Sequence, residues 1–222
     1  LVDGDGSPQG AVHTWQDNRD TVVGPDGSPL RRLRESLTTA EQMATGNELR
    51  SGLPVSTLHR LVLEGTAVQD LIPASLLSYC AASLAEVGHN RFDMHVTDAA
   101  AHGFFDLQVG TWHVPTLEVA GLTNLRLPTV HRDVTAVGLL HGRGCPVYTA
   151  VGDHQASLLG VGLARDELSI NIATGSQVSI LADTPSTTGQ TRPYFDRSLL
   201  HTITHLPAGR ALNALFGLFT EL

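Results

Sequence analysis

One carboxylate, Asp153, has the sequence surroundings of a catalytic base. Residues 145–151 (CPVYTAV) form a compact run of the β type, Gly152 breaks it, and residues 155–163 form a small apolar helical run. Asp153 is thereby placed where a strand gives way to a helix, the edge at which α/β folds bind ligands. An ionised carboxylate there can accept a proton from a hydroxyl group. Asp is also a preferred helix N-cap, worth about 1 kcal/mol, and the two roles are compatible.

A second candidate site is the turn Thr174-Gly175-Ser176. Residues 168–183 (LSINIATGSQVSILAD) carry a β-type arm on each side of this turn, which predicts a hairpin. Its two hydroxyls and the unhindered backbone at Gly175 suit a loop that closes on phosphate oxygens. Gly and Ser are also ordinary turn residues, and the chain has no GxxxxGK[ST] loop, so the turn alone is a weak signal.

The third candidate site is the segment HTWQDNR at 13–19. Trp15 offers an aromatic face, Asp17 a carboxylate and Arg19 a guanidinium. Together they suit stacking on, and hydrogen bonding to, a polyhydroxylated ligand. The alternative interpretation is a surface strand end with an ordinary Asp/Arg pair.

Other catalytic chemistries have little sequence support. The eleven histidines form neither an HExxH motif nor a Cys/His cluster, so a metal-dependent hydrolase rests on the histidine count alone. No GxSxG motif is present. Cys80 and Cys145 cannot form a CxxC pair and are predicted to be buried structural thiols.

The elements that must position these residues differ between the two halves of the chain. The first half opens with turns and a short strand at 11–15 and is then mainly helical; the second half is rich in strands. A domain boundary is predicted at 165–167. The predicted helices are 30–44, 56–64, 73–87, about 117–121, 155–163 and 211–222, and a further strand is predicted at 198–205.

Composition narrows the function classes. The 222 residues carry 14 Lys and Arg against 22 Asp and Glu, a net charge of −8, which disfavours nucleic-acid binding. With 41% hydrophobic residues the chain can build a sizeable core. No apolar run approaches the ~20 residues that span a bilayer, which predicts a cytoplasmic protein without a membrane partner. The first residue is Leu1 and the last helical run lacks a stop signal, so we expect a fragment.

Taken in order, the motifs resemble the FGGY family of carbohydrate kinases over nearly the whole chain. The resemblance is strongest to members that act on the ketose sedoheptulose. The segments that carry it are HTWQDNR at 13–19, HVTDAAAHGFFDLQVGTWHVPTL at 95–117, VYTAVGDHQASLLGVG at 147–162, INIATGSQVSIL at 170–181 and RPYFDRSLLHTITHLPAGRAL at 192–212.

The resemblance implies an α/β, actin-like ATPase (ribonuclease H-like) fold. Residues 1–164 would form most of the sugar-binding domain and residues 165–222 the beginning of the ATP-binding domain. The implied activity is ATP-dependent phosphorylation of a sugar hydroxyl, with a ketose such as sedoheptulose as the acceptor. Xylulose, ribulose, gluconate and glycerol are alternative acceptors.

The same resemblance assigns roles to single residues. Asp153 is the expected catalytic base, and Thr174, Gly175 and Ser176 are expected to contact ATP phosphates. The expected sugar contacts are Trp15, Asp17 and His154. Arg19 is expected to brace its loop, and position 154 is His where many relatives have Gln.

Two parts of the family pattern are absent from the chain. These are the N-terminal Asp-Gly-Thr phosphate loop and the Gly-rich adenosine motif. ATP and Mg²⁺ are therefore implied partners whose ligands lie mostly elsewhere, and the chain alone is expected to be inactive. The alternative is a non-catalytic sugar-binding or assembly module, and a homodimer is one assembly that the resemblance allows.

Overall fold

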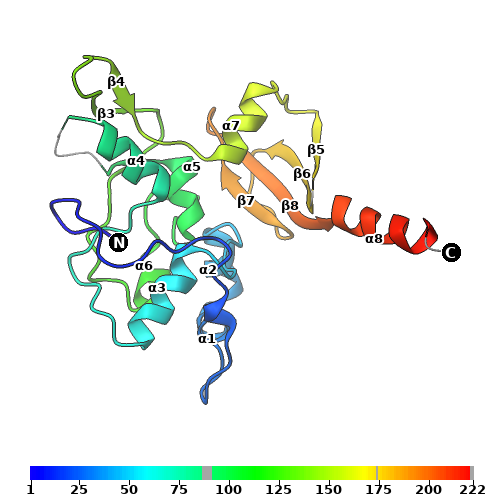
Figure 1. Ribbon diagram of the computed structural model, residues 1–222, viewed down its shortest axis with the longest axis horizontal. Helices are drawn as coiled ribbons and strands as arrows, with labels where there is room; N and C mark the ends of the chain where they lie inside the picture. The colour runs from blue at the N-terminus through cyan, green and yellow to red at the C-terminus, as the bar shows by residue number, and fades with distance from the viewer. Residues whose placement is uncertain (87–91, 174, 221–222) are drawn as a thin grey trace.

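The computed structural model describes residues 1–86, 92–173 and 175–220. Figure 1 shows two groups of elements, with helices α1 to α6 on one side and a four-stranded sheet with α7 and α8 on the other. The α-helices are α1 (Pro29–Ser36), α2 (Thr39–Ala44), α3 (Pro54–Leu63), α4 (Leu76–Leu84), α5 (Val96–Ala99), α6 (Val114–Ala120), α7 (Asp153–Gly160) and α8 (Gly209–Thr220). Short 3₁₀ turns are η1 (Arg19–Thr21) and η2 (Ala100–His102).

The strands form three sheets. β1 (Met94–His95) and β2 (Val130–His131) are parallel, and β3 (Ala136–Leu139) and β4 (Pro146–Tyr148) are antiparallel. The largest sheet has the order β5-β6-β8-β7 and is antiparallel throughout. Its strands are β5 (Leu168–Ile172), β6 (Gly175–Ala182), β7 (Gln190–Pro193) and β8 (Leu199–Pro207).

The helical stretch predicted at 30–44 is two helices, so the expectation of one element is wrong. Its interruption has a local cause. The Thr38 side chain accepts a hydrogen bond from Glu41 N, and the Glu41 carboxylate accepts one from Thr38 N. This capping box starts a new helix after the extended residue Leu37. The break matters because it sends the chain from α2 toward the sheet.

Aromatic residues of the 95–117 segment build the main core. Phe104 is fully buried, and its ring lies 5.2 Å from that of Trp112. Gly103 turns the chain into this cluster with φ +79°, and a Cβ there would lie 2.6 Å from Val55 Cγ1. A side chain at position 103 would therefore separate α3 from the cluster. The core fixes η2 and, just before it, α5.

The hairpin predicted at 168–183 is confirmed as β5 and β6, and the strand predicted at 198–205 lies within β8. Helix α7 packs on this sheet, where Leu158 clusters with Leu181, Tyr194 and Leu200. The domain boundary at 165–167 stays a prediction.

Three expectations are wrong or incomplete. Residues 11–15 form no strand, since Val12 is 73% exposed and has no strand partner to shield it. Cys80 and Cys145 are exposed rather than buried, because Cys80 lies on the side of α4 opposite to its buried residues and Cys145 precedes β4 in an exposed turn region. β7 was not predicted, since four residues ending in Pro give no strand pattern and pair only through β8. Within the described ranges, no helix is long and apolar enough to cross a membrane.

Candidate functional site

Asp153 is the first residue of α7, and its side chain is exposed. The N-cap position belongs to Gly152, so the prediction that Asp153 caps this helix is wrong. The Asp153 carboxylate instead accepts a hydrogen bond from the next backbone amide, with 2.7 Å between His154 N and Oδ1. It still lies at the positive end of the helix dipole, which favours the ionised form. The other carboxylate oxygen accepts no hydrogen bond within the described structure.

The turn before Asp153 is anchored on α5. Gly152 N donates to Thr97 Oγ1 at 3.0 Å. A Cβ at position 152 would lie 2.4 Å from Gln155 Oε1 and 3.1 Å from Thr97 O. Gln155 is buried, and its amide donates to Pro193 O at the end of β7. The start of α7 is thus held between the helical half and the sheet.

His154 faces the sheet. Its Nδ1 lies 2.9 Å from Gln177 Nε2, and its Nε2 lies 3.0 Å from Ser179 Oγ. Since the Gln177 amide donates, Nδ1 accepts and Nε2–H donates to Ser179. Burial, together with the charge of Arg192, lowers the pKa of His154, consistent with a neutral ring. Both ring nitrogens are used within the protein, so these contacts attach α7 to β6; the sugar contact expected of His154 stays a prediction.

The predicted phosphate turn lies close to α7. Ser176 is half-buried at the start of β6 and pairs with Ile172 and Leu206; Thr174 lies outside the described residues. The His154 to Gln177 contact brings the first turn of α7 next to this end of β6. On the other side of the turn, Gly209 N at the start of α8 donates to Ala173 O at 3.0 Å. Two helix starts therefore flank the turn.

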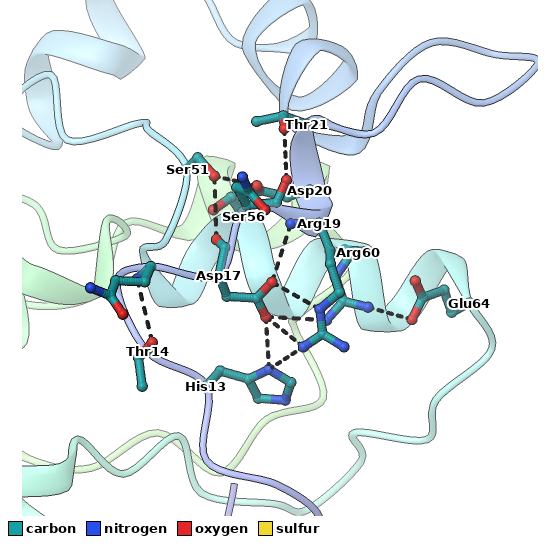
Figure 2. A network of polar contacts seen from close by, with 12 residues as sticks. His13, Thr14, Asp17, Arg19, Asp20, Thr21, Ser51, Ser56, Arg60 and Glu64 are labelled. Carbon is teal, nitrogen blue, oxygen red and sulfur yellow. Dashed lines mark hydrogen bonds and ion pairs between the residues drawn. The ribbon is translucent and has the colours of Figure 1, made fainter.

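The 13–19 loop is held by a network centred on Asp17, shown in Figure 2. Arg19 Nε donates to Asp17 Oδ1 at 2.8 Å and Arg19 Nη2 donates to Oδ2 at 2.6 Å, which is a bidentate pair. His13 Nδ1 lies 3.1 Å from Oδ2. Hydrogen bonds from Arg19 are the main reason that the pKa of Asp17 is strongly lowered. Arg19 therefore braces the loop.

A second guanidinium approaches the same carboxylate from α3. Arg60 Nη2 lies 3.9 Å from Asp17 Oδ2, and Arg60 Nη1 donates to Glu64 at 2.6 Å. Arg60 is 5% exposed, and its Nη2 has no hydrogen-bond partner among the residues that the structure describes. The Trp15 side chain is 75% exposed. The backbone of Trp15 packs against Gly52, where an added Cβ would lie 2.1 Å from Trp15 O. The indole is free to stack on a ligand.

The structure brings together only some of the sequence-predicted residues. His154, next to Asp153, contacts Gln177, which follows Ser176 at the start of β6. Across the described residues, no hydrogen bond or ion pair joins the 13–19 loop to them. Thr97, Gln177 and Arg60 were not predicted as site residues from the sequence. A buried arginine within the apolar pattern of α3 was a usable signal; Thr97 and Gln177 gave none, because their partners are distant in sequence.

Two further features concern ligands. Among the described residues, no group of three or more His, Cys, Asp or Glu side chains could hold a metal ion. A cavity of about 210 Å³ lies between the two groups of elements. Its lining contains no residue of the three candidate sites. Its lining includes Val96, Leu107, Arg132, Tyr194, Phe195 and Arg197.

Two sequence relatives of the chain are sedoheptulokinases. The chain is 28% identical to human sedoheptulokinase over 213 residues and 30% identical to the mouse protein over 226 residues. These matches cover 82% and 92% of the chain but 44% of each relative, so the chain spans less than half the length of the curated relatives. No protein-family model matches.

Solved structures share the fold. A ligand-bound xylulose kinase from Lactobacillus acidophilus has a TM-score of 0.73 at 16% identity, covering 91% of this chain and 43% of its own. A gluconate kinase from the same organism has a TM-score of 0.71 at 14% identity, with the same coverage. The expected resemblance to FGGY sugar kinases, with an α/β, actin-like ATPase fold, is confirmed. Because these neighbours act on different sugars, the fold itself does not select the substrate.

Proposed function

We propose that the chain contributes the sugar-side and phosphate-side residues of an ATP-dependent sugar kinase, with a ketose such as sedoheptulose as acceptor. The observation that carries this proposal is the place of Asp153. Its carboxylate is exposed at the start of α7, and the adjacent His154 contacts Gln177, which directly follows Ser176. This contact supports the proposal that a proton acceptor and a phosphate-binding turn act together. The names of the sequence relatives support both kinase chemistry and a ketose.

In the proposed reaction a sugar hydroxyl donates a hydrogen bond to the Asp153 carboxylate. The hydroxyl oxygen forms a bond to phosphorus, the bond from that phosphorus to the departing ADP oxygen breaks, and the hydroxyl proton passes to Asp153. ATP, when bound, supplies the phosphoryl group. Such transfers depend on positioning and charge neutralisation, so a carboxylate on an anchored helix start suits the task.

The remaining candidate residues take supporting roles. Gly175 and Ser176 would offer N–H and hydroxyl donors to phosphate oxygens, the role that the resemblance also implies for Thr174. Trp15 would stack on the sugar, and Asp17, held in place by Arg19, would accept a hydrogen bond from a sugar hydroxyl. Mg²⁺ is implied by the family resemblance, with most of its expected ligands outside this chain.

The test combines calorimetry with a coupled ADP-release assay. Sedoheptulose, xylulose, gluconate and glycerol are each titrated into a full-length kinase that contains this chain, and the same protein is then assayed with ATP and Mg²⁺. The proposal predicts that a ketose binds and that ADP release depends on it. Ketose binding without ADP release would support a non-catalytic sugar-binding module instead. No binding of any sugar would contradict the proposal.

A further inference from the structure

A buried hydrogen-bond relay ends at the residue before Asp153. Gly152 N lies 3.0 Å from Thr97 Oγ1, and Thr97 Oγ1 lies 2.7 Å from His95 Nδ1. On the other side of the ring, His95 Nε2 lies 2.8 Å from Arg132 O. Thr97 is 2% exposed and His95 is 1% exposed, so water does not compete for these groups.

The donors and acceptors of the relay fit in one direction only. A backbone N–H can only donate, so Gly152 donates to Thr97 Oγ1; a carbonyl can only accept, so His95 Nε2–H donates to Arg132 O. His95 Nδ1 then carries no proton and accepts from the Thr97 hydroxyl. It also accepts from Thr97 N at 3.3 Å, which caps α5. Burial lowers the pKa of His95, which agrees with this neutral tautomer.

Residues from both halves of the structure hold the His95 ring of the relay in place. The His95 ring stacks on Phe195, with centroids 5.4 Å apart and planes at 26°. Phe195 lies in the connection between β7 and β8, while His95 ends β1. The imidazole therefore has no freedom to turn away from Thr97, and the Thr97 hydroxyl has one orientation in which both of its bonds are made.

We propose that Thr97 is a positioning residue for the proposed phosphoryl transfer. Oriented by His95, its hydroxyl fixes Gly152 N–H and so sets the direction in which the Asp153 carboxylate leaves the start of α7. The inference rests on the proposed function and adds residues to which the resemblance assigned no role. A misplaced carboxylate would slow proton transfer while leaving the sugar contacts of the 13–19 loop intact.

Three variants test the proposal. Thr97→Val keeps the shape of the side chain and removes the hydroxyl, whereas Thr97→Ser keeps the hydroxyl. Thr116→Val is the matched control, because Thr116 is fully buried and its Oγ1 lies 2.8 Å from His113 Nδ1 at the start of α6. It breaks the same kind of bond without reaching α7. Hydrogen exchange of the Gly152 amide is measured by NMR on this chain without substrate, and kcat and KM are measured with the ketose in a full-length kinase that contains it.

We expect Thr97→Val to speed Gly152 exchange by about tenfold. We also expect it to lower kcat by at least about tenfold with KM little changed. Thr97→Ser should restore both values, and Thr116→Val should change neither. Unchanged exchange in Thr97→Val, or equal losses of kcat in Thr97→Val and Thr116→Val, would overturn the proposal. If exchange responds as expected but no variant, the wild type included, phosphorylates a sugar, the proposed function fails and Thr97 is reduced to a structural role.

Discussion

At the scale of single residues, the sugar-side loop depends on the charge of Asp17. Its lowered pKa means that the folded state holds the ionised form more firmly than the unfolded state does. This stabilisation is complete above the unfolded pKa of about 4 and is lost as the pH falls through the lower folded pKa. Asp17→Asn should therefore lower the thermal midpoint at pH 7, and the difference from wild type should shrink below about pH 4.

Thermal unfolding followed by circular dichroism from pH 7 to pH 3 measures this difference. Asp26→Asn is the control, because Asp26 is exposed at a turn outside the Asp17 network. Ketose affinity should fall about tenfold in Asp17→Asn, since one charged pair with Arg19 is lost. A difference that stays constant down to pH 3 would show that the Asp17 charge does not stabilise the loop.

The sequence indicates which residues lie at an element junction better than it indicates what their side chains contact. The type and spacing of Asp153 indicate a carboxylate at a strand-to-helix junction, which the structure contains. They could not show that Gly152 takes the N-cap position, because Asp and Gly both serve there and tertiary contacts decide between them. The direction of the His154 ring was equally hidden, since its partner Gln177 is 23 residues away.

At the scale of elements, the start of α7 has no room for a side chain at position 152. Gly152→Ala would place a methyl group 2.4 Å from Gln155 Oε1, a buried atom. We expect a loss of about 1–3 kcal/mol in the free energy of unfolding, because either α7 or Gln155 must move. Chemical denaturation measures the loss.

Gly160 at the other end of the same helix is the matched control. A Cβ at position 160 meets nothing within 4 Å. Gly160→Ala should raise the free energy of unfolding by up to about 1 kcal/mol, because alanine has the better helix propensity. If both substitutions change the free energy of unfolding in the same direction, the crowding at Gly152 does not constrain α7.

Helices and the hairpin were predictable because their patterns are local. The β5–β6 hairpin follows from alternation on each side of a Gly-Ser turn. The break between α1 and α2 was also predictable from neighbouring residues, because Thr38 and Glu41 form a capping box, but it was not predicted. β7 was not accessible, because its four residues become a strand only by pairing with β8 and by contacts with residues 46–50.

At the scale of the whole molecule, Glu48 links the helical half to the sheet. It is 1% exposed and forms an ion pair with Arg192 of β7, while Gln190 Nε2 donates to its Oε2 at 3.2 Å. Thr191 N donates to Gly46 O at 2.9 Å beside it. Glu48→Gln should lower the free energy of unfolding by about 3–5 kcal/mol, because Arg192 would lose its buried counter-charge.

The control for this link is Glu35→Gln. Glu35 pairs with Arg31 at 2.7 Å, but both side chains are largely exposed, at 61% and 72%. The urea midpoint of unfolding of Glu35→Gln should equal that of the wild type. Equal midpoints for Glu48→Gln and wild type would show that the contact between the two halves does not depend on this ion pair.

The role of Asp153 as catalytic base is tested by ketose-dependent ADP release in Asp153→Asn, made in a full-length kinase that contains this chain. Asn keeps the size of the side chain and its acceptor for His154 N but cannot take a proton. Asp166→Asn, which changes an exposed carboxylate between α7 and β5, is the control. This role predicts that Asp153→Asn folds normally, binds the ketose and loses about 10²–10⁴-fold in kcat, while Asp166→Asn keeps the kcat of the wild type. Equal ADP release by Asp153→Asn and wild type would contradict it.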